Sequence, residues 1–167
     1  IQDALSEVTA VASYLSEEQD TALKIHDDGT VIVASDPLDG SSNIDTNVSI
    51  GTIFSILPAV GGILQAGRNQ IAAGFFVYGP QTTLLVTFGK SVMAFQLDDD
   101  GDFYDMDWQV KITPDTDEFA INASNMRQWH SDVAAYINDC LAGATGPRIQ
   151  NFNMRWIGSL VADAWRI

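Results

Sequence analysis

The sequence predicts an α/β protein in which helices are layered on a mostly antiparallel sheet. Helical spacing of apolar residues occurs near both ends of the chain and after residue 130. Between these segments, short runs rich in β-branched and aromatic residues are separated by turns containing Gly, Pro or Asp-Gly. This alternation fits either an α+β arrangement or an αβαβα layered sandwich.

The first elements lead to an acidic loop. Apolar residues at three- and four-residue spacing predict a helix over residues 1–16. Two strands are expected at residues 22–25 and 31–34, and the Asp28-Gly29 pair between them predicts a hairpin. The second strand leads directly into residues 36–42, which are dense in carboxylates and hydroxyls.

The middle of the chain is expected to form most of the sheet. Residues 48–57 have the composition of a strand. Residues 67–78 fit either element, because Phe75 and Phe76 suit a helix face while Gly74 weakens a helix, and a helix is favoured. Four further strands are expected, at residues 82–87, 92–97, 103–112 and 119–122.

The last third of the chain is expected to hold two helices. Ser131-Asp132 is predicted to cap a helix that ends at Gly143. Residues 158–167 are again helical in pattern, and their apolar face ends abruptly at the last residue. We therefore expect residues 1–167 to form one partial domain of a longer protein.

Composition narrows the function classes. With 46% hydrophobic and 18% charged residues the chain should fold, and no apolar run reaches the about 18 residues of a membrane span. The net charge of −14 disfavours nucleic acids and anionic membrane surfaces as partners. It also means that an anionic substrate needs metal cations or amide dipoles, unless the charge is only a solubilising surface.

The chain contains a single cysteine, Cys140. It lies within an apolar helical pattern, so no intrachain disulfide can form and a buried packing role is expected. This use of cysteine favours a cytoplasmic location.

Two pairs of carboxylates are candidate metal ligands. Glu17 and Glu18 follow the first predicted helix, and Asp36 and Asp39 flank a turn fixed by proline. The carbonyl of Leu38 could supply a further oxygen, and such hard donors suit Mg²⁺ or Mn²⁺. The alternative is ordinary: an adjacent glutamate pair is often solvated surface, and an Asp-Pro-Leu-Asp turn can be a simple cap.

A phosphate site is expected next to these carboxylates. Gly40, Ser41 and Ser42 leave backbone N–H groups and hydroxyls free to surround an anion. Metal ions beside a phosphate neutralise its oxygens and lower the pKa of bound water, which is the chemistry of phosphate monoester hydrolysis.

These residues lie within a long motif that resembles the signature of class I fructose-1,6-bisphosphatases. The resembling segments are Ser16-Glu17-Glu18, residues 36–45 (DPLDGSSNID), residues 47–54 (NVSIGTIF), Gly67-Arg68-Asn69, Ala72-Ala73-Gly74, Ile121-Asn122 and residues 155–163 (RWIGSLVAD). They span nearly the whole chain. The resemblance implies the αβαβα sandwich of the sugar phosphatases.

The resemblance also implies roles for the residues of the acidic loop. Glu17, Glu18, Asp36, Asp39 and the Leu38 carbonyl match the metal shell, with Glu18, Asp36 and Asp39 as catalytic carboxylates. The residues that match the loop around the 1-phosphate are Asp39, Gly40, Ser41 and Ser42.

Three residues in the second half of the chain match the binding site for the 6-phosphate. Asn122 matches a residue that contacts this phosphate. Arg155 matches the arginine that reaches it from a neighbouring subunit in family tetramers. Trp156 stands where the family usually has a tyrosine, and its indole N–H can donate although its bulk changes the reach. A homo-oligomer is therefore expected.

The resulting expectation is a metal-dependent phosphatase of gluconeogenesis that hydrolyses the 1-phosphate of fructose 1,6-bisphosphate. Family chains begin before Ile1 and continue after Ile167 with a lysine for the sugar phosphate and a glutamate for metal, so weak or no activity is expected of this piece alone. Two alternatives are a non-catalytic module that binds metal or phosphosugar, and a sedoheptulose-1,7-bisphosphatase.

Overall fold

A computed structural model describes residues 1–108 and 110–166 of the chain. These residues form two compact units. The first unit comprises Ile1–Val110 and Ser159–Arg166, and the second comprises Lys111–Gly158. Compact units of a partial chain need not fold independently, so the expectation of one partial domain stays a prediction.

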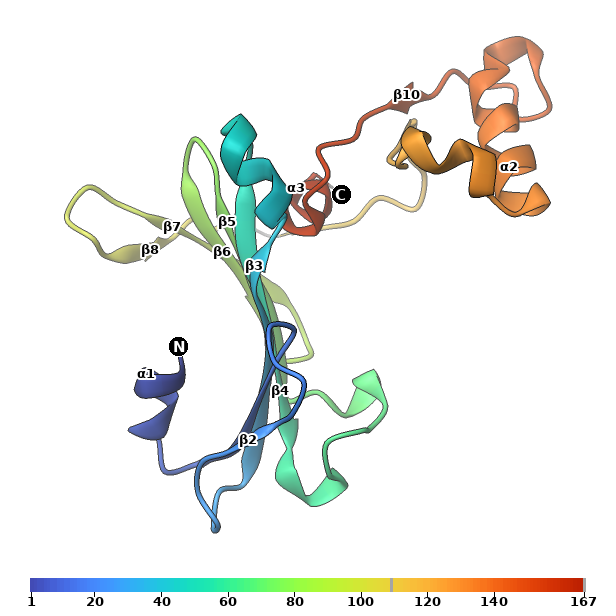
Figure 1. Ribbon diagram of the computed structural model, residues 1–167. Helices are drawn as coiled ribbons and strands as arrows, with labels where there is room; N and C mark the ends of the chain where they lie inside the picture. Colours follow the sequence, from blue (N-terminus) through green and yellow to red (C-terminus); the bar gives the residue numbers. More distant parts are fainter. Residues whose placement is uncertain (109, 167) are drawn as a thin grey trace. The chain divides into compact units, whose positions relative to one another are not determined.

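The first unit is built on one curved sheet of eight strands in the order β2-β1-β3-β4-β5-β6-β7-β8 (Figure 1). Neighbouring strands are antiparallel except for β1 and β3, which are parallel. This mixed sheet with accompanying helices confirms the predicted α/β class. The strands are β1 (Val11–Ser16), β2 (Leu23–Lys24), β3 (Val31–Asp39), β4 (Ile50–Pro58), β5 (Ala72–Tyr78), β6 (Thr82–Thr87), β7 (Val92–Leu97) and β8 (Phe103–Asp105).

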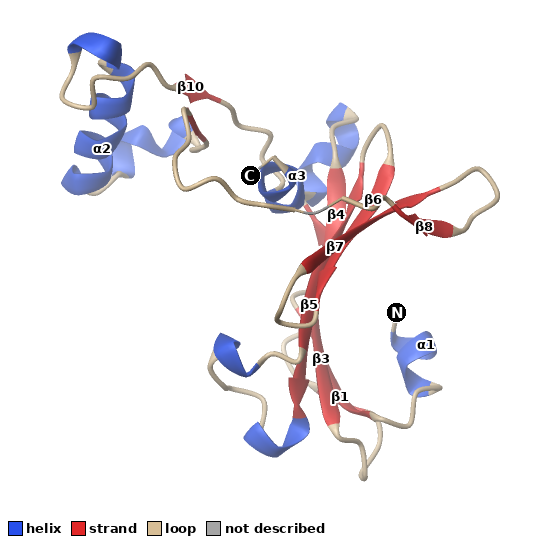
Figure 2. Cartoon of the chain, turned by 180° about the vertical axis from the view of Figure 1, so that it is seen from behind, coloured by secondary structure: helices blue, strands red, loops and turns tan. Residues whose placement is uncertain are grey.

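The helices of the first unit are short and lie on both sides of the sheet. Helix α1 (Gln2–Ser6) lies on the concave side, and the 3-10 turns η2 (Ala59–Gly61) and η3 (Gly67–Asn69) lie on the other side (Figures 1 and 2). Helix α3 (Leu160–Trp165) packs against β4 and β5 and buries Val161 and Ala162. The chain therefore leaves this unit after residue 110 and returns to it at Ser159.

The second unit combines a small sheet with one long helix. Strands β9 (Glu118–Phe119) and β10 (Asn153–Met154) pair in parallel. Helix α2 (Ser131–Leu141) buries Ile137 and Cys140, and the 1% exposure of Cys140 confirms its expected packing role. The short helices η4 (Ala123–Gln128) and η5 (Gly143–Thr145) complete the unit.

The predicted helix over residues 1–16 is wrong for its second half. Only Gln2–Ser6 is helical, and Val11–Ser16 forms strand β1. The pairing of β1 with β3 shifts between Val11 and Ser13, and this irregularity buries both Val11 and Tyr14. The apolar spacing that indicated a helix here included Ala12 and Leu15, which the strand leaves only half-buried.

The predicted hairpin joining residues 22–25 to 31–34 is also wrong. Strand β2 pairs with β1, and β1 lies between β2 and β3. The Asp-Gly turn signal is local and cannot show that an earlier strand has taken the position beside β3.

The favoured helix over residues 67–78 is wrong as well. Residues 72–78 form strand β5, paired with β4 on one side and β6 on the other. Gly74 is required there by close packing, because a Cβ atom would lie 2.5 Å from the Leu85 carbonyl oxygen and 2.7 Å from the Phe54 ring. The glycine that weakened the helical pattern is thus required by the packing of the sheet.

The remaining elements differ from expectation mainly at their ends. Strands β6 and β7 have the predicted bounds, whereas the strands expected at 103–112 and 119–122 are shorter. His130 rather than Ser131 is the N-cap of α2, and its Nδ1 accepts a hydrogen bond from the Asp132 amide at 3.3 Å. Residues 109 and 167, within the predicted strand 103–112 and helix 158–167, lie outside the described residues.

No helix among the described residues is both long enough and apolar enough to cross a membrane.

Replacing Gly51 with alanine should destabilise the first unit. A Cβ atom at Gly51 would lie 2.1 Å from the Phe76 carbonyl oxygen and 2.5 Å from Val161 Cγ2, so β4, β5 and α3 would have to separate. Such overpacking costs about 1–3 kcal/mol, which urea unfolding would measure. The control Gly67→Ala, which meets no atom within 4 Å, should change stability by less than about 0.5 kcal/mol. Equal effects of the two substitutions would contradict the packing seen here.

Candidate metal and phosphate site

The acidic turn lies at the end of β3, where its pairing with β4 becomes irregular. Asp36 is opposite Ile53 and Asp39 is opposite Gly51, so β3 carries an extra residue across this stretch. Pro37 has no N–H to donate to the sheet. The amide of Leu38 instead donates to Asp36 Oδ1 at 2.9 Å, which closes a tight turn around the proline. The sequence correctly predicted a proline-fixed turn at the end of a strand.

Parallel pairing brings Glu17 to this turn. Ser16, the last residue of β1, is paired with Ser35 of β3, and the Glu17 amide donates to the Ser35 carbonyl at 3.1 Å. The hydroxyls of Tyr14 and Ser35 also bond to each other at 2.7 Å, with Tyr14 only 2% exposed. Because Ser16 and Ser35 are paired and the strands run in the same direction, the next residues, Glu17 after β1 and Asp36 within β3, lie side by side.

Among the predicted carboxylates, Asp36 has the largest effect on the pKa of Glu17. The negative charge of Asp36 and a hydrogen bond between the two carboxyls raise the pKa of Glu17 above its ordinary value. Partial loss of water contacts and the charges of Glu18 and Asp39 shift the Glu17 pKa in the same direction. Both glutamates are exposed and both aspartates are half-buried, so the acidic group lies at the surface of the sheet edge.

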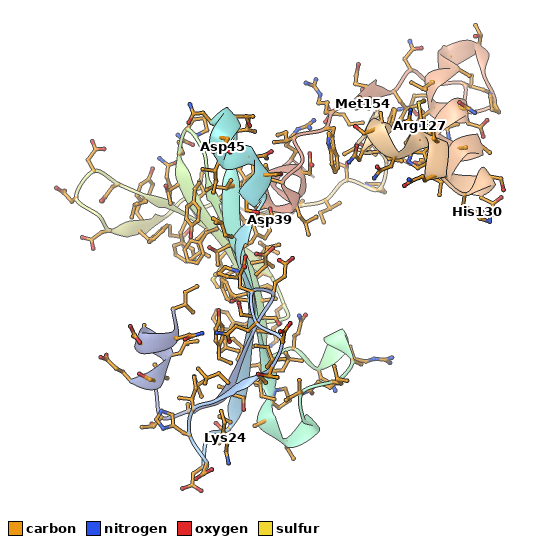
Figure 3. The ribbon with its side chains drawn as sticks, in the orientation of Figure 1. Lys24, Asp39, Asp45, Arg127, His130 and Met154 are labelled. Carbon is orange, nitrogen blue, oxygen red and sulfur yellow. The ribbon has the colours of Figure 1, made fainter. Side chains whose placement is uncertain are left out.

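Asp39 is held by the start of helix α3. Its Oδ2 accepts hydrogen bonds from Ser159 Oγ at 2.7 Å and from the Val161 amide at 3.0 Å. Figure 3 labels Asp39 at the end of β3, next to α3. Ser159 is 1% exposed, so this interaction is shielded from water. Two donors that are remote in sequence thus fix the direction of the Asp39 carboxylate.

The expected phosphate loop follows Asp39 directly. Gly40 has a left-handed backbone, with φ of 76°, and a Cβ atom there would lie 2.8 Å from the Cβ of Ser159. Ser41 and Ser42 are exposed and begin the 3-10 helix η1 (Ser41–Thr46). The first amides of a helix have no acceptor within the helix, so this loop presents N–H groups next to the carboxylates.

The donor set fits a hard divalent cation in its chemistry. All expected ligands are oxygen atoms. Two of the carboxyl groups, those of Glu17 and Asp36, share a hydrogen bond, which contributes to the raised pKa of Glu17. Among residues 1–108 and 110–166, no three acidic, histidine or cysteine side chains are arranged so that they could hold a metal ion. The pair Glu17 and Asp36 is therefore the part of the expected metal shell that the structure brings into contact.

An open cavity of about 560 Å³ adjoins this pair on the sheet. Glu17 and Asp36 contribute to its wall, and the rest comes from β1 and β3–β7, including Phe54 and Leu85. The two carboxylates thus lie beside an apolar surface that includes Phe54 and Leu85.

The residues expected to contact the 6-phosphate lie in the second unit. Asn122 Oδ1 accepts a hydrogen bond from the Ser124 amide at 3.0 Å and caps η4. Arg155 Nε contacts Glu118 Oε1 at 2.5 Å, across the β9–β10 pair. Trp156 is exposed. Asn122, Arg155 and Trp156 thus belong to the second unit, whereas the carboxylates belong to the first.

Comparison with known families and proteins identifies the chain. The profile for the fructose-1-6-bisphosphatase N-terminal domain matches residues 1–107, and the profile for its C-terminal domain matches residues 112–167. This chain belongs to the fructose-1,6-bisphosphatase family. The match to the second profile includes α3, which packs on the sheet of the first unit.

Individual relatives agree with this assignment. A class 1 fructose-1,6-bisphosphatase of Cereibacter sphaeroides is 52% identical over 169 residues, covering 98% of this chain and 51% of the relative. The class 1 fructose-1,6-bisphosphatase of Paracoccus denitrificans is 55% identical over 157 residues, covering 91% of this chain and 48% of the relative. The holo crystal structure of Leishmania major fructose-1,6-bisphosphatase superimposes with a TM-score of 0.90 at 30% identity, covering 99% of this chain and 55% of that one. The chain thus spans about half the length of the relatives that it matches.

Reasoning from the sequence missed three contacts at these residues. They are the bonds from Ser159 to Asp39, from Thr52 to Pro37 and from Arg155 to Glu118. Ser159 and Thr52 lie within the motifs quoted above, but nothing in a motif shows which residue its side chain meets. Glu118 carried no signal, because its role depends on strand pairing with a segment far along the chain.

Removing the Ser159 hydroxyl should loosen Asp39. Ser159→Ala leaves a carboxylate with one of its two recorded donors, and a hydrogen bond to a charged group contributes about 1.5–3 kcal/mol. We expect a loss of this size in urea unfolding, whereas Ser91→Ala at an exposed position should have little effect. Unchanged stability of Ser159→Ala would show that the Asp39 contact contributes nothing.

Neutralising Glu17 should stabilise the metal-free protein at neutral pH. Because the pKa of Glu17 is raised in the folded state, its stabilising contribution exists below its unfolded pKa and disappears as pH rises through the folded value. Glu17→Gln should remove this pH-dependent loss, which thermal unfolding between pH 4 and pH 8, in chelator, would show. A stability–pH curve parallel to that of the wild type would contradict the coupling between Glu17 and Asp36.

Proposed function

We propose that this protein acts in the metal-dependent hydrolysis of the 1-phosphate of fructose 1,6-bisphosphate. The observation that carries the proposal is the contact between Glu17 and Asp36, with Asp39 and the Gly40-Ser41-Ser42 loop immediately beyond it. Family membership and the names of relatives that are about half identical to this chain support the same activity.

Magnesium is the proposed cofactor, with manganese as a substitute. The residues proposed to hold it are Glu17, Glu18, Asp36, Asp39 and the Leu38 carbonyl, all of them oxygen donors. When bound, a divalent ion would neutralise phosphoryl oxygens and lower the pKa of a water molecule.

The chain's own groups would then position the substrate. Gly40, Ser41 and Ser42 present amides and hydroxyls to the 1-phosphate, while Glu18, Asp36 and Asp39 are the carboxylates at the reacting end. Asp39 is suited to a fixed role, because Oδ2 is already bonded to Ser159 and Val161. Its other oxygen then has a defined direction toward a ligand.

Three residues of the second unit are proposed to contact the 6-phosphate. Because Oδ1 of Asn122 is bonded to the Ser124 amide, its Nδ2 is the group left to donate to a phosphate. Arg155 supplies positive charge, and Trp156 supplies an indole N–H. Arg155 is proposed to act on the site of a neighbouring copy, which makes a homo-oligomer part of the proposal.

The cellular role proposed is the fructose-1,6-bisphosphatase step of gluconeogenesis in the cytoplasm. The single buried Cys140 supports a reducing compartment, since no disulfide within the chain can form.

Neutralising a proposed metal ligand should weaken metal binding, whereas neutralising another exposed aspartate should not. Asp36→Asn should weaken Mn²⁺ binding and lower turnover of fructose 1,6-bisphosphate by at least about 10- to 100-fold, because even outer residues of metal sites have effects of this size. Asp45→Asn, at an exposed aspartate of η1, is the matched control and should bind as the wild type. Calorimetry and phosphate release, with sedoheptulose 1,7-bisphosphate as competitor, are the measurements.

The activity is measured on the protein at its natural full length. Absence of phosphate release from fructose 1,6-bisphosphate with Mg²⁺ or Mn²⁺ would overturn the proposed function. Preference for sedoheptulose 1,7-bisphosphate would correct the substrate and leave the site in place.

A further inference from the structure

Thr52 is a buried hydroxyl that the proposed chemistry does not use. It lies on β4, is 9% exposed, and faces the irregular stretch of β3 between Asp36 and Asp39. Its Oγ1 lies 2.9 Å from the Pro37 carbonyl oxygen and 2.9 Å from the Tyr78 hydroxyl. A threonine opposite a proline bulge therefore connects three neighbouring strands through side-chain bonds.

The direction of these bonds follows from the chemistry of the groups. A carbonyl oxygen only accepts, so the Thr52 hydroxyl donates its single hydrogen to Pro37. The bond with Tyr78 must then run from the Tyr78 hydroxyl to Thr52. The result is a chain from Tyr78 to Thr52 to Pro37 in which each donor polarises the next, which strengthens the final bond.

The bond to Pro37 acts on the peptide group that shapes the acidic turn. The Pro37 carbonyl and the Leu38 amide belong to one planar peptide group. Thr52 holds its oxygen, and Asp36 Oδ1 holds its N–H at 2.9 Å. Rotation of this peptide would break the Asp36 bond, so Thr52 restrains one proposed metal ligand, Asp36, without contacting the metal.

We propose that Thr52, supported by Tyr78, is a positioning residue that orients Asp36 for a divalent cation. This inference rests on the proposed function for the metal and adds the group that sets the geometry of the turn. A purely structural hydroxyl would affect stability alone. A positioning hydroxyl also affects metal affinity and the hydrogen-exchange rate of the Leu38 amide.

The main test compares two substitutions of Thr52. Thr52→Val keeps the branched shape and removes the hydroxyl, and Thr52→Ser keeps the hydroxyl and removes a methyl group. We expect Mn²⁺ binding, measured by calorimetry on the full-length protein, to weaken about tenfold in Thr52→Val and to stay within about threefold in Thr52→Ser. Tyr78→Phe should weaken Mn²⁺ binding about two- to threefold, because Thr52 still donates to Pro37.

The matched control is Thr83→Val. Thr83 is also a buried threonine of the sheet, 3% exposed, but it lies on β6, away from the acidic turn. Mn²⁺ affinity in Thr83→Val should equal that of the wild type. Equal losses in Thr52→Val and Thr83→Val would overturn the proposal, because a general loosening of the sheet would then explain both.

A second readout needs no metal. Amide hydrogen exchange of Leu38, followed by NMR in chelator, should be about 3- to 10-fold faster in Thr52→Val and unchanged in Thr52→Ser and Thr83→Val. If Thr52→Val fails to fold, Tyr78→Phe carries the test with the same two readouts.

The outcomes separate the inference from the function on which it rests. If the wild type binds no Mn²⁺, the proposed metal function fails, while faster Leu38 exchange still supports Thr52 as the group that holds the turn. If Thr52→Val folds, binds Mn²⁺ as the wild type and leaves Leu38 exchange unchanged, Thr52 has no positioning role.

Discussion

The parallel pairing of β1 with β3 is the constraint on which the acidic site depends. Every other neighbouring pair in the eight-stranded sheet is antiparallel, so adjacent strands elsewhere end at opposite edges. Only parallel neighbours deliver their last residues to the same edge, and here those residues lead into Glu17 and Asp36. The Tyr14–Ser35 bond and the Glu17–Ser35 backbone bond fix the register just before the carboxylates. A slip of one residue would turn Glu17 to the other face of the sheet.

The turn beyond this edge is held from several elements at once. Thr52 of β4 bonds to Pro37, the start of α3 bonds to Asp39, and Gly40 makes room for Ser159 through its left-handed backbone. Helix α3 reaches the turn only after the chain has passed through the second unit. The site is therefore a tertiary feature, completed by the last described segment of the chain.

Because the site is assembled from segments far apart in the chain, only its local features were predictable from the sequence. The acidic motif and the strand before it were recognisable, because composition and turn chemistry are local. Strand β1 was mistaken for helix, since the apolar spacing of the helix at residues 2–6 continues through Val11, Ala12 and Leu15 although these residues form a strand. The contact between Ser159 and Asp39 joins residues 120 positions apart and left no trace in either segment. Local signals predict which residues matter, and only pairing and packing determine which of them meet.

The donors that hold the carboxylates are neutral, and this determines what the site is able to bind. Asp36 accepts from a backbone amide, and Asp39 accepts from a hydroxyl and an amide. The ion pairs recorded among the described residues involve other acids, namely Asp27, Glu118 and Asp132. Neutral donors orient a carboxylate without cancelling its charge, whereas a lysine or arginine would do both. In a chain of net charge −14, the unneutralised acids at one edge of the sheet repel an anion such as a sugar phosphate. A cation held between them reverses the sign of the local field, so attraction of an anionic substrate becomes conditional on prior occupancy by metal.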